Sequence, residues 1–149
     1  MAGKEPGMFR IVAGDIRLET AVRAVEGPDR GAIATFSGMA RAHHAGKRVL
    51  SLEYHAYPEM AERVFRAIGE EVASRFGTPH VAILHRTGRL EIGETSVVIA
   101  VASAHRREAL AGCAHAIERV KAIAPIWKRE YYEGGSTWIE GPERKPSGR

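Results

Sequence analysis

Two lysines, Lys121 and Lys128, stand seven residues apart in the segment "KAIAPIWKRE", and every residue between them is apolar. On a helix, Lys121 shares a face with Ile117, four positions earlier, and that face is expected to meet the core. Pro125 ends such a helix, and in a strand that follows Lys128 alternates onto the same face as Glu130. We therefore expect the two ammonium groups to converge where the helix meets the strand.

A convergent pair of lysines has a chemistry that a solvated lysine lacks. Two ammonium groups can bind one anion through charge-assisted hydrogen bonds. Each cation also disfavours the charged form of the other, which makes a neutral amine available as a base or a nucleophile. The alternative is that Lys121 only complements the negative end of the helix dipole, with its head group in solvent.

Two further segments carry basic residues beside expected strand ends. His105 and Arg106, in "SAHRR", lie where an apolar strand gives way to a long helix. Basic side chains there oppose the helix dipole unless an anion is bound, so this is either an anion site or a solvated helix end. In "FSGMAR", Gly38 permits close approach of the backbone and Arg41 follows it, although a glycine in a strand more often marks a bulge.

The composition excludes several classes of protein. At 149 residues, with 44% hydrophobic and 27% charged residues, the chain has the size and balance of one globular domain. The net charge of +4 favours an anionic partner without identifying it. No apolar run approaches the roughly 20 residues that span a bilayer. The N-terminal segment has no apolar region of a secretory signal, so a cytoplasmic location is expected.

Neither disulfide nor metal chemistry is expected. Cys113 is the single cysteine, which leaves no internal disulfide or cysteine-based zinc cluster, and its place on the apolar stripe of a helix favours a buried, inert thiol. The seven histidines form no HExxH pattern, and His85 and His105 are each followed by arginine. The chain also contains no P-loop, dinucleotide-binding fingerprint or nucleophile elbow.

The hydrophobic pattern predicts which elements position these residues. Strands are expected over residues 9–14, 31–41, 49–57, 80–88 and 95–104, and a hairpin over residues 126–132 and 136–140 turns around Gly134 and Gly135. Helices are expected over residues 15–27, capped by Asp15, over residues 58–77, with Pro58 in first position, and over residues 105–124. The inward face of the third helix should carry Leu110, Cys113, Ala114, Ile117 and Val120.

Strands come in adjacent pairs between the helices rather than in strict alternation with them. This order predicts one α+β domain over residues 1–149, with a mixed, mostly antiparallel sheet and two long helices. Residues 42–48 are expected to form a solvated, mobile loop. Residues 142–149 have nothing to pack against and are expected to form a mobile tail.

The chain resembles the large, catalytic subunit of molybdopterin synthase between about Phe36 and Trp138. The resemblance is carried, in order, by "FSGMAR", "LEYHAYPEMA", "LHRTGRLEIGE", "SAHR" and "VKAIAPIWKRE". Each piece is weak alone, but the combination is specific, above all the lysine seven residues before the lysine of "PIWKRE".

The resemblance implies an α/β-hammerhead-like fold, a homodimer and a heterotetramer with two small ubiquitin-like sulfur-carrier subunits. The carrier's C-terminal Gly-Gly, as a thiocarboxylate, would transfer sulfur twice to cyclic pyranopterin monophosphate and form the dithiolene of molybdopterin. No cofactor, metal, nucleic acid or membrane is implied. On the matching motifs, the resemblance implies that Lys121 and Lys128 are the catalytic lysines. These two lysines also bind substrate, together with Met39, Ala40, Arg41, His105, Arg106, Arg129 and Glu130.

The charge and pKa of these side chains suggest which role each has in the reaction. We expect Arg41, His105 and Arg106 to hold the phosphate, Lys121 to orient the intermediate and Lys128 to act as acid and base. Members of the family often have a basic residue shortly after the last hairpin, and this residue contributes to the site of the other subunit of the dimer. Here Pro142 stands at the equivalent place, with Arg144 or Lys145 as possible substitutes. The loop "MARAHHAGKR" is a variant of the family's, so no role is carried over to His43, His44 or Lys47.

Three other interpretations remain open at the level of the sequence. A basic nucleic-acid-binding α+β protein would use Trp127, Tyr131 and Tyr132 as stacking platforms. A phosphohydrolase or lyase acting on another phosphorylated metabolite would use His105 and the lysines, and would turn over without a partner. A paralogue that keeps the fold without the activity is the third.

Overall fold

The computed structural model describes residues 7–139, which form two sheets and three helices. The first sheet has the strand order β1-β5-β7-β2, built from β1 (Met8–Val12), β5 (His80–Arg86), β7 (Thr95–Ser103) and β2 (Ala32–Met39). β1 and β5 are parallel, and the other neighbours are antiparallel. The second sheet is antiparallel, with the order β3-β4-β8-β9 and a further strand, β6, paired with β4. Its strands are β3 (His43–His44), β4 (Lys47–Ala56), β6 (Gly88–Glu91), β8 (Ile126–Tyr132) and β9 (Gly135–Ile139).

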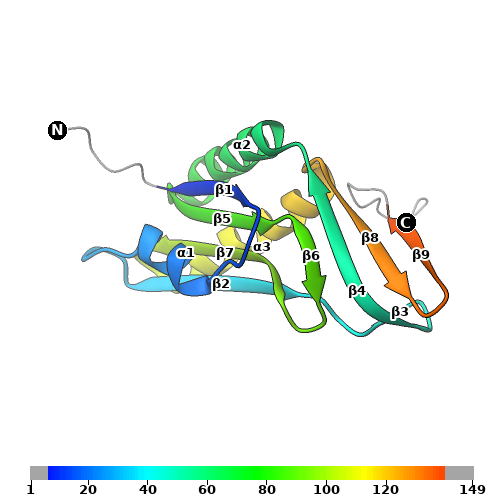
Figure 1. The fold of residues 1–149 in the computed structure, drawn as a ribbon. Coiled ribbons are helices and arrows are strands. Elements are labelled where there is room, and N and C mark those ends of the chain that lie inside the picture. The colour runs from blue at the N-terminus through cyan, green and yellow to red at the C-terminus, as the bar shows by residue number, and fades with distance from the viewer. Residues whose placement is uncertain (1–6, 140–149) are drawn as a thin grey trace, which may run out of the picture.

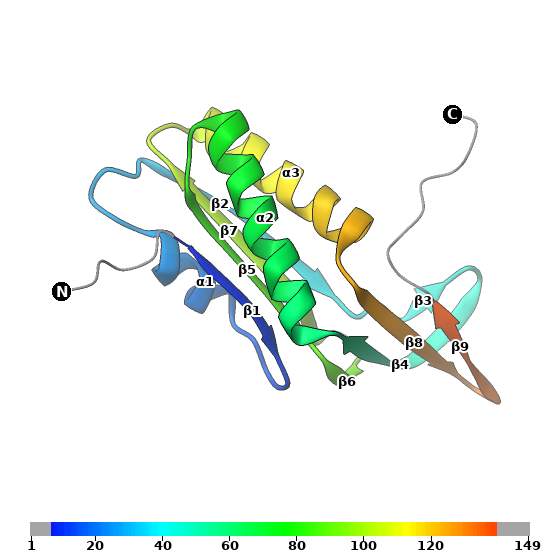
Figure 2. The same ribbon diagram turned by 90° about the horizontal axis from the view of Figure 1, so that it is seen from above.

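Helices cover both faces of the first sheet. The helices are α1 (Leu18–Val25), α2 (Pro58–Phe76) and α3 (Arg106–Ile123). α2 and α3 lie side by side over one face, and α1 lies against the other, while the second sheet extends beyond one end of the first (Figures 1 and 2). Alternation along β5 serves both layers, because Val81 and Ile83 join the core under α2 and α3, whereas Ala82 and Leu84 join the core over α1.

The two long helices begin and end where the sequence predicts. Pro58 occupies the first turn of α2, and Gly77 ends that helix in the left-handed conformation, with φ of 71°. α3 stops at Ala124, whose extended backbone is the conformation that the following Pro125 requires. The expected α+β class is therefore confirmed, and its last helix leads directly into β8.

The inward face of α3 differs from the expected one. Cys113 and Val120 are buried as expected, but Leu110 is 61% exposed and Ala114 lies in solvent. The helix instead packs closely through small residues, and a methyl group on Gly112 would come within 3.0 Å of both Val72 and Val101. The buried face is formed by Ala109, Gly112, Cys113, Ala116 and Val120, and Leu110 lies to one side of it.

The second sheet has a smaller core that joins the first at the start of β8. Its buried residues are Ala40, Val49, Leu52, Tyr54 and Leu90. Ile126 packs against both this cluster and the core beneath α2 and α3. The end of α3 and the beginning of β8 therefore lie at the junction between the two sheets, as Figure 2 shows.

Three local expectations were wrong. Helix α1 is shorter than residues 15–27, and Asp15 does not cap it, because its carboxylate pairs with Arg86 at 3.0 Å. Residues 89–94, expected only to connect two strands, include most of strand β6 (Gly88–Glu91). The expected solvated loop over residues 42–48 is instead the β3–β4 hairpin, in which Ala45 and Gly46 both have positive φ, as a two-residue hairpin turn requires.

Some expectations fall on residues outside the described range. These are the mobile tail over residues 142–149, and Pro142, Arg144 and Lys145 as a substitute for a basic residue contributed across the dimer. Within residues 7–139 no helix is both long and apolar enough to cross a membrane.

Candidate functional site

The junction between the two sheets contains a buried imidazole. His85 is 3% exposed and lies near the end of β5, paired with Val97 of β7. Its ring meets the ring of Tyr54 edge to face, with centroids 4.9 Å apart and planes at 67°. Tyr54 of β4 stands opposite Lys128 of β8 in the second sheet. The ring of Tyr54 therefore links the end of the first sheet to the strand that carries Lys128.

The charges of both predicted catalytic lysines lower the pKa of this one imidazole. Lys121 lies in the last turn of α3 and Lys128 in β8, and both side chains are half-buried. Burial, followed by the charges of Lys121 and Lys128, lowers the pKa of His85 to about 4, against a raising effect of its hydrogen bond to the backbone. The two cations thus lie at a common corner, on either side of the helix-to-strand turn at Pro125.

The hydrogen bond of His85 fixes its tautomer. Nδ1 lies 2.9 Å from the carbonyl oxygen of Arg86, and a carbonyl can only accept, so Nδ1 carries the proton. Because the pKa is about 4, the ring is neutral near pH 7 and Nε2 keeps a free lone pair. The corner consequently combines two cations with a neutral acceptor.

A buried carboxylate lies two residues further along β8. Glu130 is 3% exposed, and its Oε1 accepts hydrogen bonds from the hydroxyl of Tyr132 at 2.5 Å and from Nδ1 of His44 at 2.7 Å. Burial alone would raise the pKa of Glu130, but these two donors and the charge of Lys128 hold it below its ordinary value. The β3–β4 hairpin is therefore tied to β8 through an ionised side chain.

Arg129 points away from this corner. Its guanidinium lies over the rings of Tyr131 and Trp138, 5.3 Å from each centroid, and its Nε donates to the hydroxyl of Ser136. Strand alternation places it on the opposite face from Lys128, as the sequence predicts. Of the predicted substrate-binding residues in β8, only Lys128 and Glu130 share the face directed to the junction.

The segment from Met39 to Arg41 lies close to the corner. Ala40 is 2% exposed and belongs to the same small core as Tyr54, while its backbone exchanges hydrogen bonds with Gly93 and Glu94. Its neighbours Met39 and Arg41 are exposed. Arg41 therefore directly follows a residue of the small core to which Tyr54 belongs, and its own side chain is exposed.

His105 and Arg106 lie at the other end of the molecule. Ala32 of β2 pairs with Ser103 of β7 and Met39 pairs with Thr95, so Arg41 and His105 lie beyond opposite ends of β7. α3 begins beside His105, and Lys121 lies 16 residues further along it, so about 24 Å of helix separates His105 from Lys121. One chain does not bring Arg41, His105 and Arg106 to one phosphate.

Comparison with known proteins places this geometry in a family. The family model described as MoaE protein matches residues 11–123. The chain belongs to the MoaE family. A curated relative from Halalkalibacterium halodurans, named molybdopterin synthase catalytic subunit, is 45% identical over 131 residues, which cover 88% of this chain and 84% of that protein.

Solved structures agree with this MoaE assignment. The crystal structure of molybdopterin synthase from Staphylococcus aureus has a TM-score of 0.85 and 40% identity, covering 89% of this chain and 97% of that one. A complex of subunits 1 and 2 of molybdopterin-converting factor from Helicobacter pylori has a TM-score of 0.70 at 21% identity, over 93% and 92% of the two chains, and supports the fold.

Several residues near the α3–β8 turn were not named as site residues from the sequence. His85 alternates with Val81 and Ile83 in "HVAILHR", and this period of two already predicts an inward side chain. Tyr54 lies in a similar strand pattern. Strand alternation places Tyr132 on the same face as Glu130, but nothing in the sequence signals that His44 meets Glu130, because that contact spans 86 positions.

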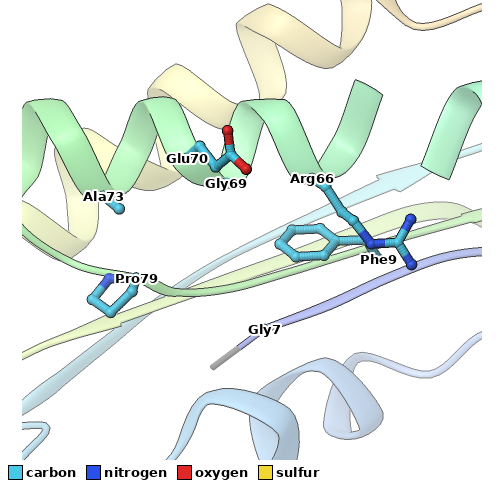
Figure 3. Close-up of a pocket in the computed structure, with 7 residues that line it drawn as sticks. All are labelled: Gly7, Phe9, Arg66, Gly69, Glu70, Ala73 and Pro79. Atoms are coloured by element: carbon cyan, nitrogen blue, oxygen red, sulfur yellow. The ribbon is translucent and has the colours of Figure 1, made fainter. Parts of the chain in front are cut away.

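A separate cavity lies away from this corner. It has a volume of about 290 Å³ and opens between α2 and β1, where Phe9, Gly69 and Pro79 line its apolar part (Figure 3). Arg66 and Glu70 of α2 also border it, and no predicted site residue does. Among residues 7–139 no group of three or more His, Cys, Asp or Glu is arranged to hold a metal ion.

Proposed function

We propose that this MoaE family member is the catalytic subunit of a molybdopterin synthase, which transfers sulfur from a carrier thiocarboxylate to cyclic pyranopterin monophosphate. The observation that carries this proposal is the meeting of α3 and β8, where the charges of Lys121 and Lys128 both lower the pKa of one buried, neutral imidazole, His85. A cationic corner with a neutral acceptor suits a reaction in which both reactants are anions. The names and identities of the relatives support the same activity.

The lysines divide the reaction between binding and proton transfer. The thiocarboxylate sulfur forms a bond to a side-chain carbon of the pterin while a carbon–oxygen bond at the same carbon breaks. The departing oxygen keeps the bonding pair and takes a proton from Lys128, and the carrier stays attached through a thioester. Water then cleaves the thioester, so that sulfur stays on the pterin and the carrier leaves as a carboxylate. Lys121 orients the anionic intermediate, and Lys128 donates and accepts the protons of the two steps.

A complete site needs a second copy of the chain. His105 and Arg106 lie about 22–24 Å of helix away from Lys121, too far to hold the phosphate of the same substrate. In a homodimer with two-fold symmetry, each chain can deliver these cations to the corner of the other. Mixing His105→Ala and Lys128→Ala subunits should then restore activity that neither variant has alone. Continued inactivity of exchanged heterodimers would place the phosphate site within one chain.

The partner is proposed to be a small ubiquitin-like protein with a C-terminal Gly-Gly thiocarboxylate, bound twice in a heterotetramer. The related protein from Helicobacter pylori is described as a complex of two subunits, which supports a two-subunit organisation. A cytoplasmic location is part of the proposal, and the free thiol of Cys113 is compatible with a reducing compartment.

Substitution of Lys128 tests the assignment. Lys128→Ala should abolish sulfur transfer while leaving carrier binding intact, because the substitution removes the acid and base but little of the docking surface. Lys47→Ala is a matched control, since Lys47 is the remaining lysine of the described range and is exposed, with Nζ 5.1 Å from the ring centroid of Tyr132. Near-normal turnover by Lys128→Ala would contradict the role given to it.

The other interpretations receive no comparable support. Tyr131 and Trp138 already flank Arg129, so part of the aromatic surface that a nucleic acid would need is occupied by the protein's own cation. A partner-independent hydrolase or lyase would turn over without a carrier, and omission of the carrier distinguishes it.

A further inference from the structure

Helix α3 carries an apolar stripe, formed by Leu110, Ala114 and Ile117, that one chain does not bury. Leu110 is 61% exposed, Ala114 is exposed, and Ile117 is only partly buried. Steps of four and three residues place these side chains along one flank of the helix. The stripe was expected in the core, but it lies beside the face that packs there. A line of apolar side chains along a helix is the pattern of a packed face.

The stripe faces away from α2. On the other flank of α3, His115 and Arg119 bind Glu71 of α2 at 2.8 and 3.1 Å. Successive helical residues are about 100° apart, so Leu110 and Ala114 point roughly opposite to that flank. α3 packs on β2 and β7, whereas α2 packs on β1 and β5, so the stripe lies on the β2 side of the first sheet (Figure 2). β2 is the edge strand there, and no described strand pairs with its outer side.

The stripe is self-complementary about its centre. Arg106 continues its line at one end and Lys121 at the other, and Ala114 lies close to the midpoint between them. Two antiparallel copies of α3 that pack together near Ala114 therefore place Leu110 of one copy against Ile117 of the other. The same arrangement brings Arg106 of one copy beside Lys121 of the other, which a single chain holds far apart.

The charges that border the stripe are complementary in this arrangement. Arg107 and Glu118 are exposed and lie on the same side of the stripe, and neither forms an ion pair within residues 7–139. Eleven residues separate them, about 16 Å of helix, which is too far for contact within one chain. In the antiparallel pair, Arg107 of each copy lies opposite the helical turn that carries Glu118 of the other.

We propose that the α3 stripe and the adjoining edge of β2 form the interface of a two-fold homodimer, in which α3 packs antiparallel against α3 of a second copy. The second copy covers the stripe and pairs Arg107 with Glu118 twice, once on each side of the axis. The use of this interface to complete a phosphate site rests on the proposed function, whereas the pairing of the two helices does not.

The oligomeric state tests the surface directly. Sedimentation equilibrium of the full-length protein should show a dimer, and Leu110→Glu should raise its Kd about a hundredfold or more, because two carboxylates would be buried against apolar side chains. Met60→Glu is the matched control, since Met60 is 54% exposed on α2 and the same change there should leave the dimer intact. A monomeric wild-type protein, or a dimer that survives Leu110→Glu, overturns the proposal.

Cysteine cross-linking tests the register of the two helices. Ala114→Cys should form an intermolecular disulfide on mild oxidation, because the two copies of this position lie near the two-fold axis. Arg107→Cys should not, because its two copies lie about 20 Å apart along antiparallel helices. The wild-type protein, whose Cys113 is buried, is the second control. A disulfide in Arg107→Cys but none in Ala114→Cys contradicts the antiparallel register.

Charge reversal tests the same register without oxidation. Arg107→Glu or Glu118→Arg alone should raise the dimer Kd about tenfold, and the double variant should recover most of the affinity, because each reversed pair is restored across the interface. Failure of the double variant to recover refutes the pairing. If the dimer and its cross-link form but the protein transfers no sulfur, the proposed function fails and the interface stands. Thermal unfolding of each variant identifies any that does not fold, and the cross-link then decides the inference.

Discussion

Replacing Glu130 by glutamine should destabilise the fold in a way that depends on pH. The glutamine keeps the size and one acceptor oxygen, but the hydrogen bonds from Tyr132 and His44 lose their charge assistance. Bonds to a charged group contribute about 1.5–3 kcal/mol and neutral ones about 0.5–1.5, so two weakened bonds should cost about 2 kcal/mol. For a domain of this size that loss lowers Tm by about 4–8 °C.

The sign of the pH dependence follows from the pKa of Glu130. That pKa is held below its ordinary value of 4.5, so the carboxylate contributes stability above 4.5, which is lost as pH falls through the folded-state pKa. Urea unfolding of both proteins should therefore show the full difference near neutral pH and a shrinking difference below pH 4.5. His85 is present in both proteins, so its own titration cancels in the difference.

Glu53→Gln is a matched control on the same sheet. Glu53 also binds a histidine and a tyrosine, His55 at 2.9 Å and Tyr131 at 3.4 Å, but its side chain is 34% exposed. Solvent screens such a pair, so its loss should cost at most about 0.5 kcal/mol. Equal losses in the two variants, or a loss in Glu130→Gln that is the same at every pH, would refute the reasoning.

Two further predictions concern single residues away from the lysines. Burial raises the pKa of the Cys113 thiol to about 11, so alkylating reagents should label it only after unfolding, and rapid labelling of the native protein would show that the thiol is accessible. Ala45 has φ of 52° in the β3–β4 turn, so Ala45→Asn should raise the free energy of unfolding by about 0.5–1 kcal/mol in urea titrations. An unchanged or lowered value would mean that the left-handed conformation at Ala45 carries no strain.

The parts of the fold that follow from local rules could be predicted from the sequence. Pro58 and Pro125 set the start of α2 and the end of α3 through backbone geometry that does not depend on distant residues. Strand alternation likewise separated Lys128 from Arg129, which the structure places on opposite faces of β8. Local periodicity was therefore sufficient for the two long helices and for one side of the site, but not for α1, β6 or the β3–β4 hairpin.

Features that depend on tertiary contacts were not predictable. Leu110 was expected on the inward stripe, but the helix packs through the neighbouring face of small residues that includes Gly112, and Leu110 is exposed. The β3–β4 hairpin depends on Ala45 adopting a conformation that alanine rarely takes. The separation of His105 from Lys121 follows from the length and direction of α3, and the phosphate site that we propose joins them only across two copies of the chain.

The most direct test of the central claim is a reconstitution with three components: this protein, a carrier bearing a C-terminal Gly-Gly thiocarboxylate, and cyclic pyranopterin monophosphate. The proposal predicts formation of the dithiolene product, with two carriers converted to the carboxylate for each product. Omission of the carrier, or its replacement by the carboxylate form, should abolish the product. Turnover of the pterin phosphate without the thiocarboxylate, or no dithiolene from the complete mixture, would contradict the account.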